Sequence, residues 1–163
     1  MKLKNAFLNV KWKTMLICLA IPLGVGGLAA LLTRGSMEAY DELLQPALSP
    51  PGWVFPVVWT ILYILMGWSS YRILVAEAPK ETKRNALILY GVQLFFNFMW
   101  SLLFFRWELR LSAFFWLLTL WVLIYLTIQF FYRVDDFAGD LLLPYLLWAT
   151  YAAYLNMGVI LMN

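Results

Sequence analysis

The stretch SPPGWVFPVVWTILY, residues 49–63, decides how the chain is interpreted, because it begins a long apolar segment with two prolines, a glycine and a tryptophan. Proline is tolerated in the first helical positions, where a backbone N–H has no partner within the helix. We therefore predict that Ser49 is the N-cap and that a helix begins at Pro50. A further proline, Pro56, predicts a bend in the first turns. Trp53 is expected at headgroup depth, where indole rings are favoured.

The apolar character of this segment extends over most of the chain. Hydrophobic residues make up 64% of the 163 residues and charged residues only 13%, whereas soluble domains are about half apolar and about a quarter charged. Five stretches contain no Asp, Glu, Lys or Arg, and each reaches the roughly 20 residues that a helix needs to cross a ~30 Å hydrocarbon layer. These stretches are 14–33, 43–71, 85–105, 111–132 and 141–163.

Because a backbone in lipid must satisfy its own hydrogen bonds, we predict an all-α integral membrane protein, a single-domain bundle of five transmembrane helices. A longer connection at about residues 34–49, loop 1, is predicted to form a lid, since long loops in compact proteins are often functional. Asp140 is a natural N-cap for the last helix. The five helices are expected at about residues 14–33, 50–75, 86–105, 111–132 and 141–162.

The distribution of basic residues predicts the orientation in the membrane. Nine of the 12 Lys and Arg residues fall on the side of the N-terminus, and three fall on the other side. The positive-inside rule then places the N-terminus in the cytoplasm and the C-terminus outside. The net charge of +3 is therefore attributed to the orientation of the chain in the membrane, and nucleic acid is not an expected partner. The basic residues on the N-terminal side are Lys2, Lys4, Lys11, Lys13, Arg72, Lys80, Lys83, Arg84 and Arg133.

Polar and aromatic side chains recur at helical spacing within the apolar stretches. Gln93, Asn97, Trp100 and Phe104 share one face of the third predicted helix. The two carboxamides on this face are expected to point into the bundle. The fifth helix repeats this spacing at Tyr145, Trp148, Ala152 and Asn156, and the second offers Trp53, Thr60 and Gly67. Carboxamides inside a membrane often serve only as interhelical hydrogen bonds, worth ~0.6 kcal/mol on average. The alternative is that these faces enclose a flat ligand, and the nine tryptophans of the chain favour a site.

The first predicted helix carries a run of small residues, AIPLGVGGLAA at 20–30. Small residues four apart let another helix or a ligand come close. Close helix packing and a ligand-facing role both remain open for this run.

Several kinds of chemistry are missing from the sequence. The chain has no histidine, so it has no histidine-based triad, no HExxH zinc site and no histidine ligand for haem. No acid or base lies in the middle of a predicted span, and no Walker or GxGxxG motif is present. These absences argue against a hydrolase or a pump, and they leave a binding cavity with hydrogen-bond donors and aromatic walls.

Three long motifs identify a family resemblance. They are PPGWVFPVVWTILY at 50–63, QLFFNFMWSLLFF at 93–105 and PYLLWATYAAYLN at 144–156. With the glycines of the first helix and YDELLQP in loop 1, the chain resembles the translocator protein family, also called tryptophan-rich sensory proteins or peripheral benzodiazepine receptors. The resemblance implies a five-helix bundle, commonly a homodimer, with a pocket between helices 1, 2, 3 and 5 beneath loop 1.

The resemblance also implies the ligands: porphyrins and, in some members, cholesterol and synthetic benzodiazepine-type molecules. We expect no required cofactor, no metal site and no catalytic residue, with protoporphyrin IX or haem as the ligand. The segment LNMGVILMN at 155–163 lacks the Tyr and basic residue of the proposed sterol motif, which argues against tight cholesterol binding. Loop 1 departs from the family at Ala39 and Gln45, where Trp and Lys are usual. The candidate ligand-binding residues are Gly24, Tyr40, Trp53, Asn97, Trp100, Tyr145, Trp148 and Ala152.

The function predicted from these features is a membrane receptor or carrier that binds porphyrins in a sensory, scavenging or transport role. One alternative is a porphyrin-degrading enzyme that uses light and the pocket tryptophans. A second is a structural membrane adaptor whose cavity holds only lipid.

Overall fold

The structure is a computed structural model that describes residues 11–163, the side chains of residues 37–39 excepted. Lys2 and Lys4, which contribute to the orientation argument, lie outside the described residues. Five helices are long and apolar enough to cross a membrane, which confirms the predicted fold class. The elements in chain order are α2 (Trp12–Leu32), α3 (Ser36–Asp41), α4 (Val54–Val75), α5 (Lys80–Ser101), a π-helix η1 (Leu102–Arg106), α6 (Arg110–Tyr132), α7 (Asp136–Asp140) and α8 (Leu143–Met162).

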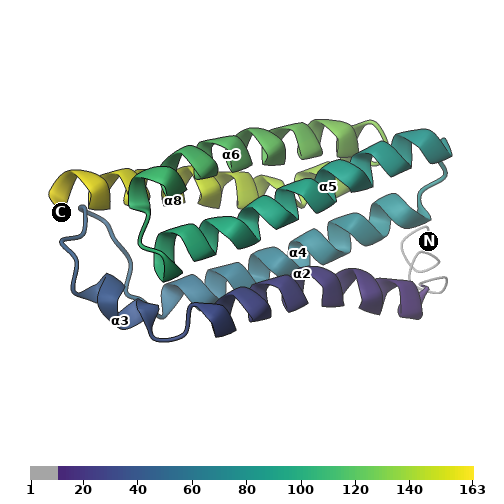
Figure 1. Ribbon diagram of the computed structural model, residues 1–163. Coiled ribbons are helices and arrows are strands. Elements are labelled where there is room, and N and C mark those ends of the chain that lie inside the picture. The colour runs from purple at the N-terminus through teal and green to yellow at the C-terminus, as the bar shows by residue number, and fades with distance from the viewer. Residues whose placement is uncertain (1–10) are drawn as a thin grey trace.

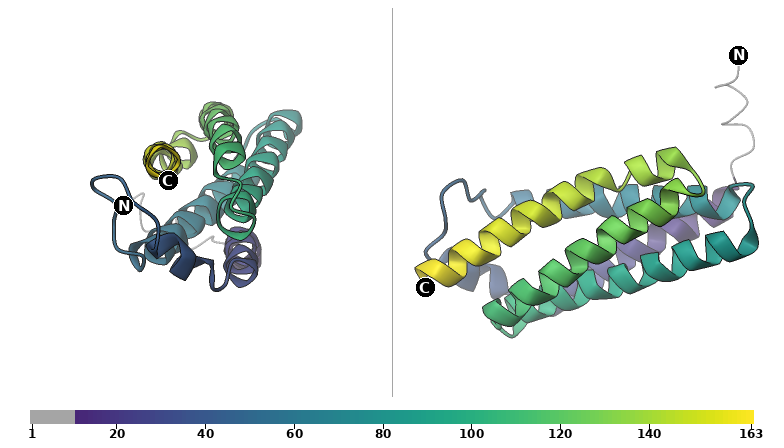
Figure 2. Two further views of the ribbon diagram at one scale, coloured as in Figure 1. Left: turned by 60° about the vertical axis from the view of Figure 1, so that its left-hand side comes forward. Right: turned by 90° about the horizontal axis from the view of Figure 1, so that it is seen from above.

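The long helices lie side by side, as Figure 1 shows, and α5 and α6 form an antiparallel hairpin. Helix α2 packs on α4 and α5, while α6 packs on α5 and α8. Loop 1 and its short helix α3 lie at the same end of the bundle as the C-terminus (Figures 1 and 2). The start of α2 and the connection between α4 and α5 lie at the opposite end. The two ends are therefore built differently, and in the described part of the chain the long covering loop lies at the C-terminal end.

The start of α4 differs from the prediction. The helix begins at Val54, and its N-cap position is Trp53, which makes no side-chain capping hydrogen bond. Ser49 is not the N-cap, because its hydroxyl donates to the carbonyl of Pro46 at 2.9 Å. The later start also places Pro56 in the first turn, where a backbone N–H has no helical partner in any case. Pro56 therefore removes no hydrogen bond from the helix interior.

Helices α2 and α4 approach closely at two glycines. A Cβ atom added to Gly67 would lie 2.7 Å from the Cα of Leu19, and one added to Gly26 would overlap the ring of Tyr63. Small residues allow such an approach in membranes, where helix association depends on close packing. For Gly26 the structure therefore supports the helix-packing interpretation.

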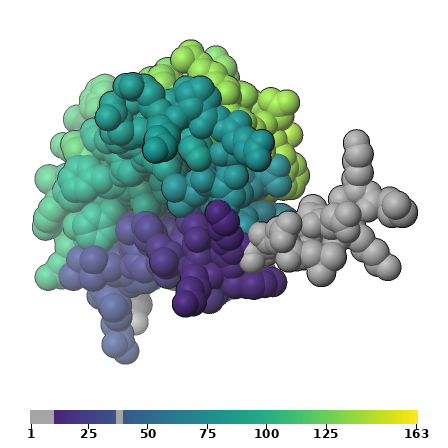
Figure 3. Space-filling view, turned by 90° about the vertical axis from the view of Figure 1, so that its right-hand side faces the viewer, coloured from purple at the N-terminus to yellow at the C-terminus, as the bar shows by residue number. Residues whose placement is uncertain are grey.

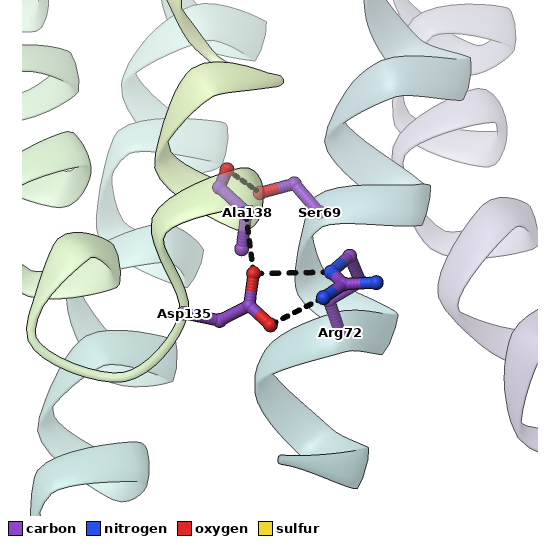
Figure 4. A network of polar contacts seen from close by, with 4 residues as sticks. All are labelled: Ser69, Arg72, Asp135 and Ala138. Atoms are coloured by element: carbon purple, nitrogen blue, oxygen red, sulfur yellow. Dashed lines mark hydrogen bonds and ion pairs between the residues drawn. The ribbon is translucent and has the colours of Figure 1, made fainter. Parts of the chain in front are cut away.

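A polar network fixes α7 to α4 at the end opposite loop 1 (Figure 4). Arg72 donates to both carboxylate oxygens of Asp135, at 3.0 and 2.6 Å. Asp135 also accepts from the N–H of Ala138 at 2.8 Å, and Ser69 donates to the Ala138 carbonyl at 2.6 Å. Burial opposes the ionisation of Asp135, but the hydrogen bonds from Arg72 and Ala138 outweigh it and lower the pKa of this carboxyl.

This network also corrects the predicted start of the last helix. Asp135 caps α7, whereas α8 begins after Leu142 without a side-chain cap, so Asp140 does not have the predicted role. Asp140 instead accepts a hydrogen bond from the Tyr132 hydroxyl at 2.8 Å. The short helix α7 thus precedes α8 at the start of the fifth candidate span.

Candidate ligand-binding site

A continuous group of aromatic rings fills the bundle beneath loop 1. Within it, Trp59 stacks on Tyr63 with ring centroids 5.6 Å apart, and Trp100 stacks on Phe104 at the same separation. Edge-to-face and tilted contacts at 4.8–6.1 Å join the remaining rings. We call this group the aromatic cluster: Tyr40, Phe55, Trp59, Tyr63, Trp100, Phe104, Phe105, Tyr145 and Trp148.

Asn97 joins three helices beside the cluster. Its side-chain carbonyl accepts from the Tyr63 hydroxyl of α4 at 2.8 Å, and its amide donates to the Tyr145 hydroxyl of α8 at 3.0 Å. Asn97 is fully buried at 0% exposure. Because both ends of its carboxamide are used, Asn97 acts in this structure as an interhelical link, which is one of the two roles considered for it.

A small cavity lies at the loop 1 side of the cluster. Its volume is about 10 Å³, roughly the space of one water molecule. The site is therefore closed by its own side chains, whereas pockets for drug-sized ligands measure about 300–1,000 Å³. The cavity is lined by Tyr40, Phe55, Trp100, Phe104, Phe105, Ala152, Leu155 and Asn156.

Among the residues that the structure describes, three polar atoms at or beside this cavity are buried without a protein partner. They are the indole nitrogens of Trp100 and Trp148 and the side-chain oxygen of Asn156. Trp100 and Asn156 line the cavity, and Trp148 contacts the lining residue Phe55. Asn156 uses its amide nitrogen to donate to the Arg110 carbonyl at 3.0 Å, so only its oxygen remains unpaired. Buried indole N–H groups usually have a hydrogen-bond partner, and an unpaired buried polar group costs about 1–3 kcal/mol. The arrangement thus offers two donors and one acceptor to a guest molecule.

Gln93, predicted on the same face as Asn97, is also buried. Within residues 11–163, both polar atoms of its amide lack a hydrogen-bond partner, as does the hydroxyl of Tyr90 one turn earlier. Gln93 does not line the small cavity. The polar face of α5 therefore continues past the cavity towards the other end of the bundle.

Loop 1 is fastened over the cavity by contacts with α8. The hydroxyls of Tyr151 and Tyr154 donate to the carbonyls of Leu48 and Ala47 at 2.6 and 2.7 Å. Asn163 pairs with the backbone of Leu44, donating to its carbonyl at 2.9 Å and accepting from its N–H at 3.1 Å. These contacts hold the loop to the last three turns of α8.

Two further features of loop 1 support its role as a cover. Tyr40 of α3 is 4% exposed and contacts Phe55, Phe104 and Phe105. Burial raises the pKa of Tyr40, with nearby Tyr151 and Asp41 acting in the same direction. Leu48 has a φ of 68°, a conformation that is uncommon for a residue other than glycine. Loop 1 therefore contains a strained residue, Leu48, whose own carbonyl accepts one of the hydrogen bonds from α8.

The π-helix η1 shapes the wall opposite Tyr40. It continues α5 for one turn, and the N–H of Trp107 donates to the Leu102 carbonyl at 2.9 Å, five residues back. Consecutive residues Phe104 and Phe105 both contact Tyr40 and Trp100. π-Turns of this kind are rare and occur frequently at functional sites.

The structure brings most of the predicted site residues together. Tyr40, Trp100, Tyr145 and Trp148 belong to the aromatic cluster, Ala152 lines the cavity, and Asn97 bonds to two cluster tyrosines.

Gly24 and Trp53 lie elsewhere. Gly24 is exposed on α2 with no neighbouring atom within 4 Å of an added Cβ. Trp53 precedes α4, and its side chain is 69% exposed, as suits an indole at the membrane surface.

Phe104 was predicted on the same face as Asn97 and Trp100, and it lies in the cluster. Four other members of the cluster were not predicted from the sequence, namely Phe55, Trp59, Tyr63 and Phe105. Phe55, Trp59 and Tyr63 recur every four residues, and this spacing could have identified the inner face of α4. The predicted face of Trp53, Thr60 and Gly67 lies away from the cluster. Thr60 is exposed and donates to the carbonyl of Pro56, and Gly67 packs against Leu19 of α2. No comparable spacing predicts the inward position of Phe105, because its orientation depends on the π-helix.

Comparison with known proteins agrees with these features. The sequence model of the TspO/MBR family matches residues 18–162. The chain is 34% identical to the tryptophan-rich protein TspO of Chlorobaculum tepidum over 96% of this chain and 99% of that protein. It is 36% identical to a tryptophan-rich sensory protein of Cereibacter sphaeroides over 96% of this chain and 95% of that protein. It is also 35% identical to the translocator protein of Bos taurus, over 80% of this chain and 79% of the other.

Proposed function

The chain belongs to the TspO/MBR family and is an integral multi-pass membrane protein, and from this premise we propose that it is a membrane receptor or carrier for porphyrins. The proposed site is the aromatic cluster with the cavity beneath loop 1. Relatives are named sensory or translocator proteins, which fits a binding role and not an enzymatic one. Sensing, scavenging or transport would each begin with the same binding step.

The observation that carries this proposal is the set of unpaired polar atoms in an aromatic wall. Flat rings offer stacking surfaces to a flat macrocycle. Trp100 and Trp148 hold indole N–H donors, and Asn156 holds an acceptor, all buried and unpaired. A porphyrin carries both ring nitrogens and peripheral oxygen atoms, so it can supply the missing partners.

The closed geometry adds a requirement to the proposal. A cavity of about 10 Å³ cannot hold a macrocycle, so binding needs the cover to move. Tyr40 belongs both to loop 1 and to the aromatic cluster. We therefore propose that loop 1 opens and carries Tyr40 out of the site when a ligand enters.

The test is a tryptophan-quenching titration of detergent-purified protein with protoporphyrin IX. We expect Trp148→Phe to weaken binding about tenfold, because an indole stacking surface is worth about 0.5–1.5 kcal/mol beyond its buried area. Ala152→Leu should weaken binding further, since added bulk in a packed site costs about 1–3 kcal/mol. Thermal melts of each variant report whether the fold is retained.

The chain offers matched controls for both changes. Trp68 lies on α4 but contacts Phe137 at the other end of the bundle, so Trp68→Phe should bind like the wild type. Ala30 is exposed on α2, so Ala30→Leu tests added bulk outside the site. Equal affinities for Trp148→Phe, Ala152→Leu and these controls would place the ligand elsewhere. Absence of quenching in the wild type would contradict porphyrin binding and favour the alternative of a structural membrane adaptor.

A further inference from the structure

A groove at the end of the bundle opposite loop 1 combines basic and apolar side chains. It lies between the end of α4 and the start of α5 and has a volume of about 440 Å³. Figure 3 looks at this end of the molecule, where α4 and α5 lie above the start of α2. The lining residues are Leu74, Lys80, Lys83, Arg84, Leu87 and Ile88, with no acidic residue among them.

The three basic residues keep hydrogen-bonding capacity for a further partner. The ammonium group of Lys83 donates to the carbonyls of Leu74 and Ala76 at 3.1 and 3.0 Å, which uses two of its three protons. Arg84 bonds to Glu81 through a single nitrogen at 2.9 Å, and a guanidinium has five donors. Within the described residues, no hydrogen bond or ion pair engages the side chain of Lys80.

The positions of the basic and apolar residues in the groove correspond to the boundary between the membrane surface and the hydrocarbon layer. Lys80 begins a span that continues to Arg106, and Val75 ends the preceding span, so the basic residues lie at the membrane surface. Leu87 and Ile88 lie about two turns beyond Lys80 along α5, and Leu74 lies beside them at the end of α4. Leu74 and Ile88 are exposed at 42% and 58%. A phospholipid has the same division between a charged headgroup and apolar chains.

We infer that this groove is a binding site for an anionic phospholipid. Its phosphate would lie between Lys80, Lys83 and Arg84, and an acyl chain would cover Leu74 and Ile88. Basic pockets between transmembrane helices bind anionic headgroups in this manner. The site is separate from the aromatic cluster, so the inference is independent of porphyrin binding.

Native mass spectrometry of the detergent-purified full chain tests the inference. Phosphatidylglycerol is compared with phosphatidylcholine carrying the same acyl chains, and we expect a preference for phosphatidylglycerol that weakens in high salt. Lys80→Gln together with Arg84→Gln should lower the affinity for phosphatidylglycerol about fivefold for each charge, or about twenty-five-fold together. Affinity for phosphatidylcholine should not change.

The control removes two charges from the same end of the bundle but outside the groove. Lys13 and Arg133 are exposed there and do not line the groove. Lys13→Gln together with Arg133→Gln should keep most of the preference for phosphatidylglycerol. An equal loss in both double variants would show that general surface charge attracts the lipid, and equal binding of the two lipids by the wild type would also overturn the inference. Displacement of the lipid by sn-glycerol 3-phosphate alone would assign the site to free phosphate compounds.

Discussion

Gly158 is the point at which loop 1 is most sensitive to a small change. A Cβ atom added there would lie 2.5 Å from the Cβ and 3.1 Å from the Cδ of Pro46, whereas ordinary contacts begin at 3.4 Å. The proline ring is rigid and cannot turn aside. Gly158→Ala must therefore displace this part of loop 1 by about 1 Å, the difference from an ordinary contact distance.

The magnitude follows from the neighbouring contacts. Overpacking of this kind costs about 1–3 kcal/mol, and the displaced segment also carries the hydrogen bonds from Tyr151, Tyr154 and Asn163. A loss of about 1.4 kcal/mol from the closed loop raises the population of the open loop about tenfold. Alanine also stabilises a helix by about 1 kcal/mol relative to glycine. The control must therefore be another substitution of a helical glycine by alanine.

Hydrogen exchange of loop 1 amides measures the opening directly. The amides of Leu44 and Ser49 are suitable reporters, because both are hydrogen-bonded in the closed loop. We expect about tenfold faster exchange at both in Gly158→Ala. Gly91→Ala provides the control, since its added Cβ meets no atom within 4 Å. Unchanged exchange at Leu44 in Gly158→Ala would refute the view that Pro46 and Gly158 hold loop 1 closed.

Three further outcomes are expected. Gly67→Ala should lower the melting temperature relative to Gly91→Ala, because its Cβ would lie 2.7 Å from the Cα of Leu19; equal melts would contradict close α2–α4 packing. Asp135→Asn should lower the melting temperature by about 2–4 °C at neutral pH, through loss of the bond to Arg72. Because folding lowers the pKa of Asp135, the wild type should lose this advantage as the pH falls below about 4; a difference that persists at pH 2 would be inconsistent. A reporter fused to the C-terminus should register outside the cytoplasm, and a cytoplasmic signal would reverse the proposed orientation.

The membrane spans could be predicted well from the sequence, because an apolar stretch of about 20 residues without charges forms few structures other than a transmembrane helix. Their ends could be predicted less well. Helix α5 begins at Lys80 and not near residue 86, since its charged first turn can remain helical in the polar surface region. Helix α4 begins later than predicted, because Pro50 and Pro51 precede the helix and do not form its first turn.

The site could be predicted where a single helical face carried the signal. Trp100 and Asn97 on α5, with Tyr145 and Ala152 on α8, occupy the expected interior positions. The predicted face of α4 was wrong because Trp53, from which it was counted, lies before the helix and is exposed. Spacing shows which side chains share one face of a helix. It does not show which face points into the bundle when both faces are apolar.

The π-helix η1 has a consequence for how members of such a family can diverge. A π-turn amounts to one additional residue within an α-helix, since its hydrogen bonds span five residues and not four. Deletion of a single residue from Leu102–Arg106 would restore regular α-helical geometry and turn Phe104 or Phe105 away from Tyr40. Homologous chains can therefore remodel this wall of the site through a one-residue change in length, without any substitution among the residues that line it.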